Sequence, residues 1–180
     1  GKVSIGTFNY DGRIDLMDAV RWLSAGIRRL KSDGVTHIAL VAHSMGGLIV
    51  SYYLRYGDQE LEQAVETWEG TVHVEKVVMA GVPFLGSMWS FRNMQYGRLI
   101  GLNSSLLHQQ AMASFPASYY TLPALGADVL VTPTQHPIRG AIHTTAHWRQ
   151  QWWGLLKGTA SAPAQIVERR DAYTSYWLDR

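Results

Sequence analysis

The chain reads Ala42-His43-Ser44-Met45-Gly46-Gly47 at the junction between an apolar run and a segment with helical spacing. A serine flanked two places on either side by small residues is typical of a nucleophile elbow, the strained turn that joins a strand of a parallel sheet to the next helix. Ala42 and Gly46 are the small residues here, and Ala42 differs by one methyl group from the first glycine of the G-x-S-x-G pattern. The sequence therefore predicts that the Ser44 hydroxyl projects from the carboxyl end of a parallel sheet.

Ser44 is the candidate catalytic nucleophile. A serine hydroxyl reacts poorly unless a base takes its proton and fixed dipoles stabilise the oxyanion that forms. In an elbow, the backbone N–H of the following residue, Met45, points into the oxyanion hole at the start of the helix. His43 is expected to pack or to form a hydrogen bond and not to act as the base, because adjacent residues of an elbow point in different directions.

Strand-like and helix-like segments alternate around this turn. The expected strands are a β-prone run over 3–8, a run over 37–42 and a run over 76–80 that ends at Gly81. The first expected helix has apolar positions from Leu16 to Leu30, with Asp15 as its cap and Gly34 at its end. The second covers residues 48–56 and ends at Gly57. The apolar run 37–42 is of the kind that is buried on both faces of a parallel sheet. Short connections between these elements indicate that residues 1–86 form the central βαβαβ part of an α/β core.

The alternation stops after Gly86. The remaining segments are helical patches over 104–112, 145–156 and 164–178, separated by prolines, with a weak strand candidate at 129–131. Residues 87–180 are therefore expected to form a mostly helical cap that is inserted after the sheet. Five of the seven tryptophans lie in this cap, and their number alone favours core packing over lipid contact.

The composition excludes several classes of protein. With 180 residues, 47% of them hydrophobic, the chain can bury one sizeable core. The absence of cysteine excludes disulfides, thiolate metal sites and a cysteine nucleophile. A net charge of +2 with no basic run longer than two residues gives no reason to expect a nucleic-acid partner. No apolar stretch is long enough for a transmembrane segment, and no G-x-G-x-x-G motif indicates a dinucleotide cofactor.

Two polar constellations are interpreted as structural. His143 and His147 have the spacing of a helical zinc pair, but the glutamate of H-E-x-x-H is missing, so packed or solvated histidines are expected. Asp11 and Arg13 are expected to form an ion pair that shapes a loop.

Four segments together resemble the lecithin:cholesterol acyltransferase-like branch of the α/β-hydrolases. Residues 9–13, Asn-Tyr-Asp-Gly-Arg, resemble the Y-D-W-R turn of that family, with Gly12 in place of tryptophan. Residues 42–47 resemble its G-H-S-x-G motif, and residues 81–87, Gly-Val-Pro-Phe-Leu-Gly-Ser, resemble its G-x-P-x-x-G-S loop. Residues 114–123 are similar to a stretch of its cap region. The motifs occur in the order and at the spacing of the family.

The resemblance implies an O-acyltransferase that acts on lipid esters through an acyl-enzyme on Ser44, with the Met45 N–H in the oxyanion hole and no cofactor. Residues 87–180 follow the loop that leaves the sheet at its carboxyl end, so they are expected to lie over Ser44. Trp89, with Met88 and Phe91, either lines a channel for an acyl chain or fills the interface between cap and sheet. The partners expected are a lipid or other acyl ester and, through the cap, a transient contact with a membrane surface. Two alternatives remain: a lipase or esterase, and a non-catalytic module that binds a lipid or a protein.

The catalytic triad of this superfamily follows the order serine, acid, histidine. The resemblance places the acid and the histidine beyond residue 180 and the second oxyanion donor before residue 1, so the 180 residues alone are expected to be inactive and poorly soluble. One set within the chain has the right order: Ser44, Asp128 and one of His136, His143 and His147. Order alone does not make a triad, because its members are defined by geometry.

Overall fold

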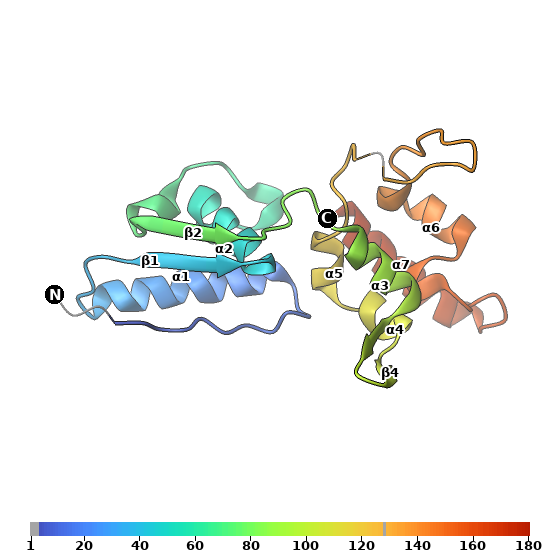
Figure 1. The fold of residues 1–180 in the computed structure, drawn as a ribbon, viewed down its shortest axis with the longest axis horizontal. Helices are drawn as coiled ribbons and strands as arrows, with labels where there is room; N and C mark the ends of the chain where they lie inside the picture. The colour runs from blue at the N-terminus through green and yellow to red at the C-terminus, as the bar shows by residue number, and fades with distance from the viewer. Residues whose placement is uncertain (1–3, 128) are drawn as a thin grey trace. The chain divides into compact units, whose positions relative to one another are not determined.

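The computed structural model describes residues 4–127 and 129–180, and the chain divides into two compact units, Gly1–Val82 and Pro83–Arg180 (Figure 1). The elements of the first unit are α1 (Leu16–Ser32), β1 (Ala39–His43), α2 (Met45–Tyr56), the 3-10 helices η1 (Leu61–Gln63) and η2 (Glu69–Val72), and β2 (Lys76–Ala80). β1 and β2 pair in parallel, with Val41 opposite Val78. Both arrows in Figure 1 point the same way, so the carboxyl ends of the two strands share one edge.

The predicted signals set the bounds of α1. Asp15 accepts a hydrogen bond from the Met17 N–H at 2.9 Å, as a helix cap does. After the helix, Gly34 takes a left-handed conformation with φ of 85°, which glycine adopts without steric strain. The side of α1 that is buried carries its regularly spaced apolar residues: Leu16, Met17, Val20, Leu23 and Ile27.

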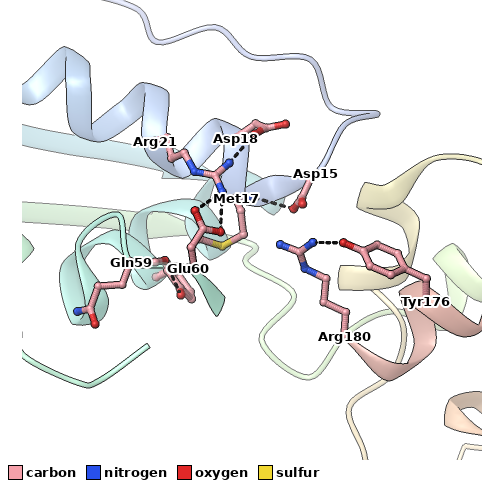
Figure 2. A network of polar contacts seen from close by, with 9 residues as sticks. Asp15, Met17, Asp18, Arg21, Gln59, Glu60, Tyr176 and Arg180 are labelled. Carbon is pink, nitrogen blue, oxygen red and sulfur yellow. Dashed lines mark hydrogen bonds and ion pairs between the residues drawn. The ribbon is translucent and has the colours of Figure 1, made fainter. Parts of the chain in front are cut away.

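A polar network ties the exposed side of α1 to the segment before η1. The Arg21 guanidinium reaches Asp18 and Glu60, each at 2.6 Å (Figure 2). The hydrogen bond from Arg21 to Glu60 is the main reason why the pKa of Arg21 is raised. Because these side chains are largely solvated, the network orients the two segments and adds little to stability compared with the apolar side of the helix.

Two predictions about the sheet are wrong. Residues 4–8 form no strand, and Ile5 is 95% exposed, because this run has no neighbouring strand edge with which to pair; Val3 lies outside the described residues. The apolar strands are not buried on both faces: Val41 is 82% exposed and Val78 is 59% exposed. Of the side chains that alternate with them, Ala42 is buried and Leu40, Val77 and Met79 are half-buried. The first unit therefore covers one face of its sheet and leaves an apolar face open.

The second unit is mostly helical. Its elements are α3 (Met88–Tyr96), β3 (Arg98–Ile100), β4 (Asn103–Leu107), α4 (Gln109–Ala113), α5 (Pro116–Tyr120), the 3-10 helix η3 (Ala141–His143), α6 (Thr145–Gln151), the 3-10 helix η4 (Gly154–Leu156) and α7 (Ala164–Asp179). Trp148 is fully buried at its centre, with Phe91 edge-to-face at 5.9 Å and Tyr119 stacked at 6.1 Å between ring centroids. The Trp148 indole N–H donates to the Ile142 carbonyl at 2.7 Å, so its burial leaves no polar atom unsatisfied.

The structure corrects the predicted helix over 104–112. Its first half belongs to an antiparallel hairpin of β3 and β4, and the helix begins only at Gln109. Gly97 and Gly101 have positive φ and turn the chain at either end of β3, and the Asn103 side chain accepts from the N–H groups of residues 105 and 106. These turn signals override the helical spacing.

The other segments of the second unit follow the predictions in part. The helix over 164–178 is present as α7. The helix over 145–156 is interrupted, because Trp152 takes a left-handed conformation between α6 and η4. The strand candidate at 129–131 forms a single bridge, between Val131 and Pro137. In residues 4–127 and 129–180, no helix is long and apolar enough to cross a membrane.

Candidate active site

Ser44 lies at the strand-to-helix junction that the sequence predicts. It follows β1 directly and caps α2, which begins at Met45, three residues earlier than expected. Its backbone has φ of 53° and ψ of −130°, a strained conformation that costs a non-glycine residue about 1–3 kcal/mol. The Ser44 N–H donates to the Ala80 carbonyl at 2.9 Å, so pairing with the end of β2 holds the strained residue in place.

The Ser44 hydroxyl forms no capping hydrogen bond with α2. A serine that caps a helix ordinarily accepts a hydrogen bond from an N–H of the first turn, so the Ser44 hydroxyl does not have this usual role. Met45 is the first helical residue, so its N–H has no carbonyl acceptor within the helix. The turn therefore offers a partly exposed hydroxyl beside the positive end of a helix dipole.

Close packing makes Gly47 the most constrained glycine of the turn. A Cβ atom at Gly47 would lie 2.1 Å from Val82 Cγ2, whereas a Cβ atom at Gly46 would meet only Tyr10 Oη, at 3.8 Å. The pattern emphasised Gly46, and sequence reasoning missed Gly47 because its constraint comes from a residue 35 positions away. The close approach fixes α2 against the loop that follows β2.

The turn over residues 9–13 lies against the elbow. Arg13 forms a two-pronged ion pair with Asp11, with N–O distances of 2.8 and 2.7 Å, which confirms the expected loop-shaping pair. The hydrogen bond from Arg13 is the main reason why the pKa of Asp11 is lowered. A Cβ atom at Gly12 would lie 3.3 Å from Met45 Cε, so the glycine leaves room for the Met45 side chain.

Tyr10 is a site residue that sequence reasoning did not single out. Its hydroxyl lies beside Gly46 in the first turn of α2, and its ring stacks on Phe8 at 5.8 Å. Burial raises the pKa of Tyr10, so the phenol stays protonated and neutral near neutral pH. The signal available in the sequence was its place in the turn over residues 9–13, beside the residues that resemble a family motif.

His43 is the last residue of β1, and its side chain is exposed. Its Nε2 would lie 3.8 Å from a Cβ atom at Gly81, so the ring lies beside the residue that follows β2.

Trp89 and its two expected companions take different positions in the second unit. Trp89 is 59% exposed on α3, and Met88 is also exposed. Phe91 is buried, with its ring 4.9 Å from that of Trp153, so it belongs to the core. These residues nevertheless line one open hollow of about 480 Å³. Its complete lining is Met88, Trp89, Phe91, Arg92, Gln95, Tyr96 and Trp153.

The histidines of the formal triad have other contacts within the second unit. His143 Nε2 lies 2.6 Å from the Pro123 carbonyl oxygen, and His136 Nδ1 lies 3.0 Å from Thr134 Oγ1. The His147 ring lies tilted against that of Trp153, with 5.0 Å between the ring centroids. Asp128 lies outside the described residues. Among residues 4–127 and 129–180, no group of three histidines or carboxylates could hold a metal ion.

The chain was compared with protein families, curated proteins and solved structures. No curated protein and no solved structure matches it significantly. The family model of lecithin:cholesterol acyltransferase matches residues 3–157, a range that includes the elbow, the turn over residues 9–13 and most of the second unit. The chain therefore belongs to the lecithin:cholesterol acyltransferase family, whose members are enzymes of the lipid acyltransferase and lipase type.

Proposed function

We propose that the protein transfers the acyl group of a lipid ester to a hydroxyl acceptor through a covalent acyl-enzyme on Ser44. The observation that carries the proposal is the strained conformation of Ser44 at the end of β1, with a hydroxyl that α2 does not use as a cap. Family membership supplies the substrate class.

In the first half-reaction, Ser44 Oγ attacks the ester carbonyl carbon and loses its proton to a base. The bond between that carbon and the leaving alcohol oxygen then breaks, and the leaving oxygen takes up the proton. The N–H of Met45 is proposed to donate to the oxyanion during both attacks, where a single donor is worth about 10²–10³ in rate. In the second half-reaction, the acceptor hydroxyl attacks the acyl carbon, its proton returns to Ser44 Oγ, and the new ester leaves. If water is the acceptor, the same steps give hydrolysis.

A fluorophosphonate probe tests the proposed nucleophile directly, because it phosphonylates only serines that a base activates. The full-length protein should gain one adduct, and peptide mass spectrometry should locate it on Ser44. Ser51 of α2, whose hydroxyl donates to Met79 Sδ of β2, is the internal comparison and should stay unmodified. An adduct on another serine, or none at any concentration of probe, would overturn the assignment.

Trp89 is proposed to contact the acyl chain of the substrate, since it is exposed beside an open hollow with apolar walls. Trp89→Ala should lower kcat/KM for long acyl esters far more than for short ones, because each methylene that leaves water contributes about 0.8 kcal/mol, or roughly fourfold. The measurement is a series of esters of increasing chain length.

Trp152→Ala is the matched control for Trp89, because Trp152 is also partly exposed in the second unit and does not line the hollow. It should reduce activity on all chain lengths equally or not at all. Equal losses on short and long esters with Trp89→Ala would show that Trp89 serves packing only.

A further inference from the structure

The hairpin of β3 and β4 exposes apolar side chains on both faces. Every residue from 98 to 106 is exposed. The large apolar residues among them are Leu99, exposed by 63%, Ile100 by 44%, Leu102 by 101% and Leu106 by 61%. A two-stranded hairpin without a covered face is at best marginally stable in water. Transfer of these apolar side chains from water into another apolar phase would therefore be favourable in free energy.

Aromatic and cationic side chains stand together where α3 runs into the hairpin. The Arg92 guanidinium lies 5.1 Å from the ring centroid of Trp89 and 5.9 Å from that of Tyr96. The Lys157 ammonium lies 4.9 Å from the Tyr96 ring. Trp89 and Tyr96 are 59% and 72% exposed, so these rings and cations face solvent. The next residue after Gly97 is Arg98, at the base of the hairpin.

The stretch of sequence that carries α3 and the hairpin has basic residues and no acidic ones. Residues 76–127 contain no aspartate or glutamate, although the whole chain has 14. The second unit as a whole has eight lysines and arginines against four acids. This excess of cations favours an anionic partner.

We infer that the hairpin and the adjoining side of α3 form a docking surface for a lipid bilayer that carries anionic headgroups. Leu99 and Leu102 enter the acyl region, Trp89 and Tyr96 lie at the headgroup level where amphipathic rings are favoured, and Arg92, Arg98 and Lys157 attract anionic lipid. An apolar hairpin flanked by aromatic rings and cations fits a lipid surface better than a protein partner. The inference deepens the proposed function by giving a lipid enzyme access to its substrate, but it does not depend on chemistry at Ser44.

Binding to vesicles tests the inference without turnover. The protein is mixed with vesicles of phosphatidylcholine alone or with about 30% phosphatidylglycerol, and bound protein is separated by flotation. We expect binding to the anionic vesicles that weakens as salt is added, because surface charges are screened within about 10 Å at 0.1 M salt. Arg92→Gln with Arg98→Gln should weaken that binding by about fivefold for each cation lost.

Leu102→Ser should weaken binding to the anionic vesicles by at least about tenfold, because a leucine side chain leaves water when it enters the acyl region and a serine side chain gains nothing by doing so. Leu125→Ser is the matched control: Leu125 is 77% exposed in the same unit but lies outside this surface. Both leucines are exposed, so both variants should keep the melting temperature of the parent. Equal binding by the two variants would overturn the inference.

Two further results distinguish docking on a bilayer from acyl transfer at Ser44 and from dimerisation. Ser44→Ala should bind vesicles as the parent does, because docking does not use the Ser44 hydroxyl. Vesicle binding therefore tests docking, and turnover of an ester separately tests the proposed chemistry. If the protein binds no vesicles but forms a dimer that Leu102→Ser dissociates, the surface receives a second copy of the chain and the inference is wrong.

Discussion

Ser44→Ala should lower kcat for acyl transfer by at least about a thousandfold, with the fold unchanged. The expectation follows from covalent catalysis, in which loss of the nucleophile leaves only oxyanion stabilisation and binding. The substitution removes one oxygen that is not used to cap α2, so no structural hydrogen bond of the helix is lost. The measurement is the release of product from an acyl ester by the full-length protein, together with a thermal melt.

Ser51→Ala is the control for this loss. It removes the same atom from the same helix, where Ser51 Oγ lies 3.6 Å from Met79 Sδ. It should leave kcat within a few fold of the parent. If both variants kept full activity, the reaction would use a nucleophile other than Ser44. The proposed acyl-enzyme on Ser44 would then be wrong.

The sequence was most informative where a short local pattern determines the backbone. Asp15 as a cap and Gly34 and Gly57 as terminators act through their own hydrogen bonds or dihedral angles, and the structure has them as predicted. The position of Ser44 between a strand and a helix belongs to the same class, because the small neighbours and the apolar run before it are contiguous. Local physics was sufficient for these features.

The sequence was least informative where contacts between residues far apart in the chain determine burial and packing. The continuous apolar run over 37–42 gave no sign that Val41 would be exposed, because burial of a strand face depends on what packs against it. The constraint on Gly47 comes from Val82, and the place of Tyr10 beside Gly46 comes from a turn more than 30 residues earlier. The hairpin was missed because helical spacing over 104–112 was weighed without the turn residues that precede it.

Gly86→Ala should destabilise the second unit more than any other glycine-to-alanine change within that unit. Gly86 has φ of 72°, and a Cβ atom there would lie 1.9 Å from the Leu122 carbonyl oxygen. The loop cannot move away easily, because the Ser87 N–H donates to the Thr121 carbonyl at 2.9 Å and the Ala124 N–H donates to the Leu85 carbonyl at 3.0 Å. The sequence analysis used Gly86 as the end of the α/β core and as part of a family motif, and the structure gives a physical reason for a glycine there.

At Gly86, the strain of a positive φ and the strain of a short Cβ contact add together. A left-handed conformation costs an alanine roughly 1–2 kcal/mol, and forcing a methyl group into a backbone contact costs about 1–3 kcal/mol more. Gly101→Ala separates them, because Gly101 has φ of 57° with no atom within 4 Å of its Cβ position. Gly26→Ala, within α1, has neither strain and should be neutral or stabilising. Urea unfolding of the three variants should therefore rank their losses of unfolding free energy as Gly86→Ala, then Gly101→Ala, then Gly26→Ala. Equal losses for Gly86→Ala and Gly101→Ala would mean that the loop over residues 83–87 yields to the methyl group, and that its packing against residues 121–124 does not hold it rigidly.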